Sequence, residues 1–537
     1  MLKCTINGVD LEVKEGSTII EAMYENHQKI AHYCWHPGLS IAGVCRLCMV
    51  QVEGNPRLQI ACNTTITEGM KINNTSPQVQ EAVKWGLDFH LINHPLDCPI
   101  CDQAGECGLQ EQYMEYGQYT SEMAEPKTKK HKVVDLGPKI VLDSERCILC
   151  SRCVRFTDEV SKTNELGIFN RGDHAEIGTH DGKKLDNPYS LNTVDICPVG
   201  ALTSKDFRFK QRAWYLKDAD TICNGCSTGC NVKVYFNKEG LFRVKPKVNH
   251  DVNGHWMCDD GRNTYKFVNK ENRQTQTYEI ATGANEWKTS KPAGELVKNV
   301  GIYFKDIKPE EMALVLTGQL MNEEYESILN TFTNKFKTKN IYHWFNNDAG
   351  YESVKNQFDG LLIRGDKNPN TNGLLNAFGQ FDIQTKWSDL ESKIKAGTIK
   401  YLTVVGPENT VVYNDIQQKI DLFTQVQYLT YMTSAKVTEL ENAKNKKNVM
   451  VVPLKTFVEK AGSFTNHAGL VQKFKKVTTV VSDALNIVEV AQLLAGEDLK
   501  LNILSDKNLF VADNTRPDQV RLEHRKKNEF VFSKGQV

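Results

Sequence analysis

Cysteine is the residue that most constrains this chain of 537 residues, because 15 of its 16 cysteines fall into four groups with short internal spacings. The groups are, in order, Cys34, Cys45, Cys48 and Cys62; Cys98, Cys101 and Cys107; Cys147, Cys150, Cys153 and Cys197; and Cys223, Cys226, Cys230 and Cys258. No cysteine follows them, so a cysteine-rich front precedes a cysteine-free back. A chain of this length is expected to fold as about three or four domains.

Composition excludes several functional classes. Lys plus Arg and Asp plus Glu both number 66, so no overall charge attracts nucleic acid or anionic lipid. The opening residues show no secretory signal pattern, and no apolar run is long enough to cross a bilayer, so we expect no direct membrane span. Cysteine pairs separated by two residues in a reducing compartment are typical of metal ligands rather than disulfides.

The spacings indicate iron-sulfur clusters, which require thiolate ligands at fixed positions. The first group resembles plant-type [2Fe-2S] ligation, although ten residues separate Cys34 from Cys45 where plant ferredoxins have about four. Gly38 and Gly43 in this gap either bring N–H groups to the cluster sulfurs or only form turns. The third group has the bacterial-ferredoxin run, completed by Cys197 before a proline, and predicts one [4Fe-4S] cluster. The fourth group offers four more thiolates.

The second group has only three cysteines, whereas a [4Fe-4S] cluster needs four ligands. His94 precedes Cys98 by four positions, and His90 is its rival. We predict His94 as the fourth ligand. A neutral imidazole in place of a thiolate removes one negative charge, so the potential of this cluster should differ from those with four cysteines.

Structural zinc is the alternative for any such group, because zinc uses the same ligands. Four groups in series, one lacking a thiolate and one carrying the cysteine-proline run, favour clusters over zinc. Cys4 stands outside the groups and is expected to be a small buried hydrophobic residue.

Local patterns predict the elements that carry these groups. Asn7-Gly8 between two alternating runs predicts a hairpin, and Thr18 with Glu21 predicts a capped helix. Residues 76–125 read as mostly helical, and the polar stretch 268–298 reads as a linker.

The back of the chain alternates strand-like and helix-like patterns. Apolar runs at 313–316, 401–405 and 449–452 predict strands. Between them an amphipathic helical face is predicted at Tyr325, Ile328, Leu329, Phe332 and Phe336. The alternation predicts a mostly parallel, doubly wound α/β sheet.

Several segments resemble the large iron-sulfur subunit (the G or 75 kDa type) of respiratory complex I, the NADH:quinone oxidoreductase. The resemblance is carried by His94 to Gln110, by Ala61 to Thr64, by Arg146 to Phe156 and by Trp256 to Arg262. It implies one [2Fe-2S] cluster on the first group and three [4Fe-4S] clusters on the others, with His94 as a ligand of the second. All four cysteines of the fourth group are present, which points to a bacterial enzyme.

The back half is similar to the molybdopterin oxidoreductase scaffold, most visibly from Phe457 to Gln472. With no cysteine after Cys258 and a shortened domain, we expect a scaffold without a metal ligand and no molybdenum. The implied fold class is α+β ferredoxin-like cluster domains followed by an α/β molybdopterin-oxidoreductase-like domain. The predicted domains are 1–75, 76–125, 126–215, 216–270 and 290–537.

The resemblance implies a relay in an oxidoreductase complex, a translocase, that carries electrons from NADH toward quinone while doing no bond chemistry itself. The implied partners are the flavin- and NADH-binding subunit, the small [2Fe-2S] subunit, the downstream subunit with two [4Fe-4S] clusters and the quinone-site subunits. The implied place is the cytoplasmic face of a bacterial inner membrane, as a peripheral part of the complex. The alternative is a subunit of a soluble NAD-linked hydrogenase or formate dehydrogenase, each of which needs further metal ligands in the cysteine-free back.

Overall fold

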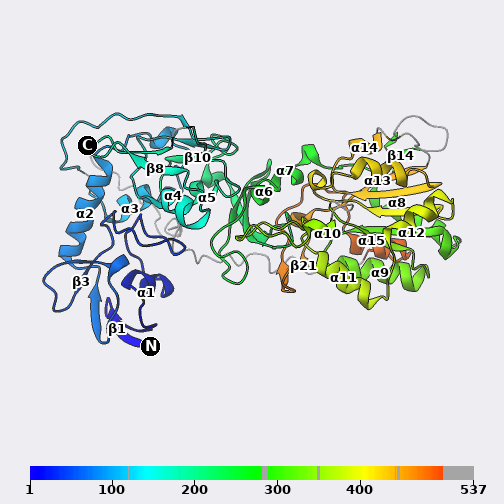
Figure 1. Cartoon of the computed structure of the whole chain (residues 1–537), viewed down its shortest axis with the longest axis horizontal. Helices are drawn as coiled ribbons and strands as arrows, with labels where there is room; N and C mark the ends of the chain where they lie inside the picture. Colours follow the sequence, from blue (N-terminus) through cyan, green and yellow to red (C-terminus); the bar gives the residue numbers. More distant parts are fainter. Residues whose placement is uncertain are drawn as a thin grey trace, which may run out of the picture. The chain divides into compact units, whose positions relative to one another are not determined.

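The computed structural model contains two compact units, one over Met1–Tyr215 and a second that begins at Leu216 (Figure 1). The described residues are 1–118, 120–180, 182–280, 288–289, 291–346, 351–441, 443 and 448–499. Within these ranges, no helix has the length and apolar character needed to cross a bilayer. The predicted division into five domains is finer than the two units and stays a prediction, and its final stretch, 500–537, lies outside the described residues.

The first unit opens with the predicted hairpin. Its turn is formed by Asn7 and Gly8, whose φ angles of 52° and 79° lie in the left-handed region. Thr18 and Glu21 form the predicted capping box of α1 (Ile19–Glu25), whose apolar face is buried. The sheet has the order β2-β1-β5-β3-β4, with β1 (Leu2–Ile6), β2 (Val9–Val13), β3 (Met49–Val52), β4 (Gln59–Ile60) and β5 (Met70–Asn73).

The rest of the first unit is built from short elements around the next two cysteine groups. The helices expected in 76–125 are present, and Ser76 caps the longer one by accepting from the Val79 N–H. The helices are α2 (Pro77–Leu91), α3 (Gly108–Tyr116), α4 (Arg152–Arg155) and α5 (Asn192–Asp195), with single 3-10 turns at Ala61–Asn63, Cys98–Ile100 and Ala213–Tyr215 and a π turn at Phe156–Val160. The strands form a sheet β10-β7-β6 and a hairpin, with β6 (Val134–Asp135), β7 (Ile140–Leu142), β8 (Leu166–Phe169), β9 (Glu176–Thr179) and β10 (Leu202–Ser204).

The second unit begins with an antiparallel sheet in the order β11-β12-β13. Short helices follow this sheet. The elements are β11 (Lys217–Ile222), β12 (Asn231–Asn237), β13 (Gly240–Pro246), α6 (Asp259–Arg262) and α7 (Tyr265–Val268), with a 3-10 turn at Lys270–Asn272.

The core of the second unit is a sheet of seven strands in the order β15-β14-β20-β19-β18-β16-β17. From β20 to β17 all neighbours are parallel, which is the doubly wound order in which the first strand lies between the second and the third. The strands are β14 (Tyr278–Ile280), β15 (Lys288–Thr289), β16 (Met312–Thr317), β17 (Ile341–Trp344), β18 (Tyr401–Val405), β19 (Tyr428–Thr433) and β20 (Val449–Pro453), followed by a separate hairpin of β21 (Gly462–Thr465) and β22 (Val471–Phe474).

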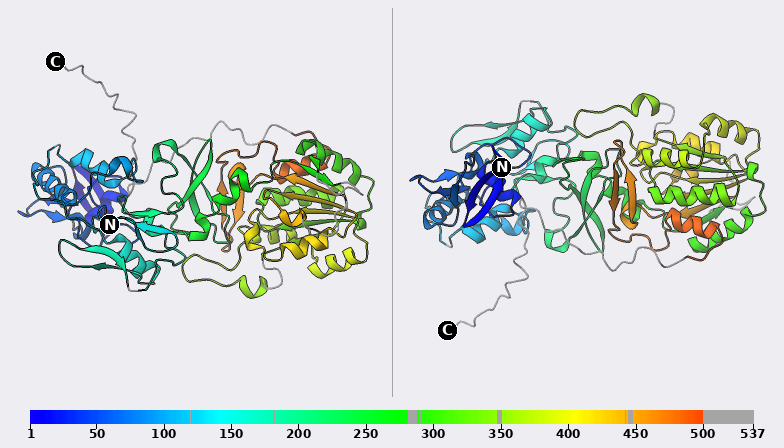
Figure 2. Two further views of the ribbon diagram at one scale, coloured as in Figure 1. Left: turned by 90° about the horizontal axis from the view of Figure 1, so that it is seen from above. Right: turned by 90° about the horizontal axis from the view of Figure 1, so that it is seen from below.

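Helices cover both faces of this sheet (Figure 2). They are α8 (Ala293–Phe304), α9 (Asn322–Asn330), α10 (Tyr351–Val354), α11 (Thr371–Gln380), α12 (Trp387–Lys395), α13 (Ile416–Phe423), α14 (Thr438–Glu441) and α15 (Ile487–Leu494), with 3-10 turns at Pro309–Glu311, Thr410–Val412 and Phe457–Glu459 and a π turn at Thr331–Lys335. The mostly parallel, doubly wound architecture is therefore confirmed.

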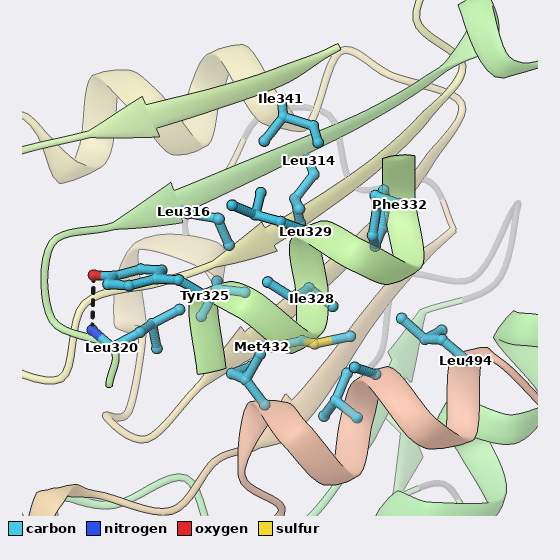
Figure 3. Close-up of a cluster of buried hydrophobic side chains, with 14 of the residues drawn as sticks. Leu314, Leu316, Leu320, Tyr325, Ile328, Leu329, Phe332, Ile341, Met432 and Leu494 are labelled. Carbon is cyan, nitrogen blue, oxygen red and sulfur yellow. Dashed lines mark hydrogen bonds between the residues drawn. The ribbon is translucent and has the colours of Figure 1, made fainter. Parts of the chain in front are cut away.

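The amphipathic face predicted from the sequence packs against the sheet, as Figure 3 shows. Tyr325, Ile328, Leu329 and Phe332 have no exposed surface, and each is expected to contribute about 1.5–3 kcal/mol through burial. The Tyr325 hydroxyl remains hydrogen-bonded, because it donates to the Thr317 carbonyl at 2.7 Å and accepts from the Leu320 N–H. Because its hydrogen bonds are satisfied, the Tyr325 hydroxyl can be buried in an otherwise apolar layer.

The predicted linker over 268–298 is wrong for much of its length. Its residues form β14, which pairs with β20, and the start of α8, while 281–287 and 290 lie outside the described residues. Arg273 in this stretch is completely buried. The stretch is polar in sequence, but it can be buried because its polar groups are satisfied inside the fold. Arg273 donates to the carbonyls of Ser434 and Leu454 and pairs with Glu459 at 2.7 Å.

Replacing Arg273 by methionine is expected to lower the free energy of unfolding of the second unit by about 3–5 kcal/mol, because Glu459 is left buried without its opposite charge. Hydrogen exchange over β19 and β20, followed by mass spectrometry, measures the change. The control is Lys339→Met, which removes an exposed ion pair with Asp382 and should leave exchange unaltered. Equal exchange in both variants would contradict the buried pair.

Candidate metal centres

The first cysteine group is closed and buried. Its four thiols lie in mutual contact, since Cys34 hydrogen-bonds to Cys45 and Cys62, and Cys48 hydrogen-bonds to Cys62. The donated hydrogen bonds lower the pKa values of Cys34 and Cys48, whereas donation to both of them raises that of Cys62. The Tyr33 N–H also points to the Cys45 sulfur at 3.4 Å. The structure therefore brings together all four predicted residues.

The glycines before Cys45 have different surroundings. The Gly38 N–H donates to Nδ1 of His36 at 3.1 Å, so it is directed at an imidazole rather than a sulfur. Gly43 has a φ of 64°, the left-handed conformation for which glycine is suited. The turn interpretation is therefore the one that the geometry favours for Gly38, and it also accounts for Gly43.

The third group lines a cavity with apolar walls. All four sulfur residues, Cys147, Cys150, Cys153 and Cys197, face it together with side chains such as Leu142 and Ile177. Leu149 and Ser151 have φ of 54° and 61°, and these left-handed residues turn the ligand loop around the cavity. Burial raises the pKa of Cys147 to about 12 and that of Cys150 to about 11.

The fourth group surrounds a second cavity, in the second unit. Cys223, Cys226, Cys230 and Cys258 line it with Met257, Leu362, Asp260, Lys367 and several glycines. Backbone N–H groups already approach two sulfurs: Gly225 points to Cys223 at 3.4 Å and Gly261 to Cys258 at 3.3 Å. Such N–H groups stabilise a negatively charged sulfur.

The second group is the most open of the four. Cys107 is buried at the start of α3 and burial raises its pKa to about 12, whereas Cys101 is half-buried and Cys98 is exposed. The segment is fixed from behind by Arg212, which donates to the carbonyls of Cys101 and Pro99. The apolar side chains of Leu96 and Ile100, on either side of Cys98, are also exposed.

The two histidines near the second group differ in their hydrogen bonds. His90 lies on α2 with Nδ1 bonded to the Gly86 carbonyl at 2.6 Å, and its ring contacts Tyr33. His94 has a buried Nδ1 without a hydrogen-bond partner. Burial, with the nearby charges of Lys127 and Arg146, lowers the pKa of His94 to about 4, so its imidazole is neutral at pH 7. A neutral ring with an unpartnered nitrogen is the state that a metal ligand requires.

Direct contacts connect the third group with the first. Arg152, on the helix that carries Cys153, donates to the Trp35 carbonyl at 2.5 Å and to the Ile196 carbonyl at 3.0 Å. Arg155, on the same helix, donates to the carbonyl of Cys34. Two side chains of one helix therefore hold both ligand loops.

The third group also contacts the second. The Gly108 N–H, just after Cys107, donates to the Pro198 carbonyl at 2.9 Å, just after Cys197. Gly200 lies directly against the Cys101 sulfur. The third group thus contacts both of the other groups of the first unit.

The donor sets fit polynuclear iron-sulfur cores. Thiolate and imidazole are the ligands of such clusters, and the third and fourth groups surround a cavity as a core of several atoms requires. Among the described residues, no three histidine, cysteine or carboxylate side chains are arranged to hold a single metal ion.

Basic residues surround these groups, and they were not predicted from the sequence. Arg146, Arg152 and Arg155 flank the cysteines of the third group, and this pattern of arginines could have been read as a signal. Lys367 gave no such signal, because it is far from the fourth group in the sequence. Tyr33 directly precedes Cys34, but nothing in the sequence distinguishes it from an ordinary apolar neighbour.

Four family models match the front of the chain. They are the 2Fe-2S iron-sulfur cluster binding domain over 1–77, the NADH-ubiquinone oxidoreductase-G iron-sulfur binding region over 86–122, the NADH-quinone oxidoreductase subunit 3 ferredoxin-like domain over 137–203 and the molybdopterin oxidoreductase Fe4S4 domain over 216–270. The matched models describe iron-sulfur domains of oxidoreductases, ferredoxin-like ones followed by a molybdopterin-oxidoreductase Fe4S4 domain.

Over this part the chain is homologous to the G-type or 75 kDa-type subunit of NADH-quinone oxidoreductase, and the resemblance predicted from its sequence is confirmed. The G-type subunit of NADH-quinone oxidoreductase from Rickettsia felis is 37% identical over 343 residues, which are 63% of this chain and 50% of that protein. The mitochondrial NADH dehydrogenase [ubiquinone] iron-sulfur protein 1 of Solanum tuberosum is 37% identical over 344 residues, 64% of this chain and 46% of that protein. The chain thus spans about half the length of the curated relatives it matches.

A solved NAD+-reducing [NiFe]-hydrogenase in the H2-reduced state is 28% identical and covers 39% of this chain and 90% of its own, with a TM-score of 0.36. Similarity at this level carries no argument about fold or function.

Gly200→Ala is expected to displace the Cys101 sulfur, because an added Cβ would overlap it. If the sulfur is a cluster ligand, purified protein should lose about four iron atoms per chain. Iron analysis of anaerobically purified protein measures the loss. The matched control is Gly379→Ala, a helical position where a Cβ meets nothing within 4 Å. Full iron content in the first variant would contradict the ligand role of Cys101.

Proposed function

We propose that this chain is an electron relay, the large iron-sulfur subunit in the peripheral arm of an NADH:quinone oxidoreductase. One observation carries the proposal: three cysteine groups of different spacing share one continuous packed region in the first unit, with direct contacts from group to group. Isolated structural metal sites have no need of such contacts. Enclosed redox centres that exchange electrons do, because the protein must fix their separation.

The proposed cofactors are one [2Fe-2S] cluster and three [4Fe-4S] clusters. The first would be held by Cys34, Cys45, Cys48 and Cys62, and the others by His94, Cys98, Cys101 and Cys107, by Cys147, Cys150, Cys153 and Cys197, and by Cys223, Cys226, Cys230 and Cys258. Two observations support His94 over His90. The buried Nδ1 of His94 has no hydrogen-bond partner, and His94 lies near Arg146, which also acts on the Cys101 thiol, whereas His90 lies near Cys34 of the first group. Clusters of these types, when bound, accept and release single electrons.

The protein's own residues would set the conditions for this transfer. Arg152 and Arg155 fix the ligand loop of the first group relative to that of the third. Leu142, Ile177 and the neighbouring apolar side chains exclude water from the cavity of the third cysteine group. A dry, rigid setting keeps the reorganisation on electron transfer small and protects the sulfur ligands.

The edge around the second group supports a partner contact. Cys98 is exposed there, and Leu96 and Ile100 beside it are 90% and 61% exposed. Phe209 and Trp214 are also exposed. They lie beside the same loop, because the Phe209 N–H donates to Asp102 and the Trp214 ring packs against Gly105. Apolar surface around a half-open redox site is expected where another subunit covers it.

The proposed partners are the flavin- and NADH-binding subunit, the small [2Fe-2S] subunit, the downstream subunit with two [4Fe-4S] clusters and the quinone-site subunits. The proposed place is the cytoplasmic face of a bacterial inner membrane, reached through these partners.

Anaerobically purified protein is expected to contain about 14 iron and about 14 acid-labile sulfide per chain, with no molybdenum. Metal analysis by plasma mass spectrometry and a sulfide assay give the numbers. Stoichiometric zinc without sulfide would overturn the relay, and molybdenum would favour the formate dehydrogenase alternative.

His94→Ala is expected to abolish the paramagnetic signal of one [4Fe-4S] cluster while leaving the other clusters intact, because the second group loses its fourth ligand. His90→Ala is the matched control and should keep every signal. The opposite pattern in electron paramagnetic resonance would assign the ligand to His90 instead.

A further inference from the structure

The cavity of the fourth cysteine group is lined by two residues from outside its ligand loops, Leu362 and Lys367, and of these two only Lys367 is charged. Lys367 belongs to the α/β domain, yet it lines the cavity together with the four cysteines. Within the described part of the chain, its ammonium makes no hydrogen bond or ion pair. An uncompensated cation beside four thiol groups is electrostatically suited to an anionic centre.

The position of Lys367 is fixed by the sheet. Its N–H donates to Oδ1 of Asn346, which follows β17, at 3.1 Å, and its neighbour Asn368 donates to the same oxygen at 2.6 Å. The Asn370 N–H donates to the Gly318 carbonyl, which follows β16. The segment is therefore bound to the carboxyl ends of two adjacent parallel strands.

The ligand loop is in turn fixed to this segment. The Ser227 N–H, between Cys226 and Cys230, donates to the Asp366 carbonyl at 3.0 Å. The hydroxyl of Thr228 donates to the carbonyl of Leu362, another residue of the cavity wall. The lysine and the cysteines thus belong to one hydrogen-bonded assembly, which holds the charge at a constant place.

We propose that Lys367 sets the redox potential of the [4Fe-4S] cluster that the fourth group would hold. Reduction adds one electron to the cluster and makes or breaks no bond, so the site becomes more negative by one charge. A fixed positive charge nearby stabilises the reduced form more than the oxidised form and raises the potential. The α/β domain thereby acts on the cluster electrostatically as well as mechanically. This inference rests on the proposed function, because it requires the fourth cluster.

Asp260 provides an internal comparison, because it lines the same cavity with the opposite charge. Burial raises the pKa of Cys258 to about 12, and Asp260 and Lys367 act on this thiol in opposite directions. Asp260 is exposed to solvent whereas Lys367 is half-buried, so water screens the carboxylate more strongly. Its effect on the cluster should be opposite in sign and smaller.

The test is a redox titration of the full chain, anaerobically purified with its clusters, with dithionite and mediators and with the fourth-cluster signal read by electron paramagnetic resonance. In Lys367→Gln the ratio of reduced to oxidised cluster at a fixed ambient potential is expected to fall about tenfold, a shift of about 59 mV for one electron. Lys367→Arg should remain near the wild type, and Asp260→Asn should shift the ratio the other way by less. Lys339→Gln, at an exposed position, is the control for a lost lysine charge.

An unchanged potential in Lys367→Gln, with the cluster present, overturns the inference and leaves the proposed function standing. Absence of a fourth-cluster signal from the wild-type protein overturns both. If Lys367→Gln loses the cluster, Lys367→Arg decides: a retained cluster supports the role of the charge, and a lost cluster overturns it in favour of a role for side-chain shape.

Discussion

Burial of cysteine sulfur in apolar pockets is the constraint on which the front of this molecule depends. Desolvation raises the pKa values of the Cys147 and Cys150 thiols, which face Leu142 and Ile177 rather than water. A neutral thiol is a weak hydrogen-bond donor, so a pocket built around four of them gains little stability by itself. Bound iron would provide the positive charge that makes a buried thiolate favourable, and its binding would then become part of the folding free energy.

Arginine side chains connect the first and third cysteine groups. A guanidinium carries several donors on a long side chain, so Arg152 reaches carbonyls next to two different ligand groups at once. Its charge also opposes the effect of burial on the pKa of Cys150. One side chain therefore fixes the spacing of two sites and adjusts the electrostatics of one of them. Cys98 of the second group is exposed, so the environment of this group differs most from those of the others.

Interactions between residues close together in the sequence were predicted, whereas interactions between residues far apart in the sequence were not. The Asn7-Gly8 turn, the capping box of Thr18 and the buried face of α9 depend on residues a few positions apart, and each was predicted. The stretch 268–298 was misread as a linker because the partners of Arg273 lie more than 150 residues away. Lys367 escaped notice for the same reason. The ligand assignments came from the spacing of the cysteines and from the resemblance of the surrounding segments.

The carboxyl edge of the parallel sheet is where doubly wound folds ordinarily bind ligands, at the switch between the first and third strands. Here the loops after β16 and β18 are joined, because Gln319 accepts from the N–H groups of Glu408 and Asn409. The buried Lys460 ammonium pairs there with Glu324 at 2.8 Å and with Glu408 at 3.2 Å.

Glu408 also accepts from the side chain of Asn224, inside the fourth ligand loop. Removing Lys460 would leave two buried carboxylates without their opposite charge, so the edge resists rearrangement. An edge made rigid in this way is a platform on which the loop of Cys223 to Cys230 can be held at a fixed distance from Lys367. The back domain therefore contributes to the surroundings of the fourth cysteine group through the part of its fold that doubly wound folds ordinarily use for binding.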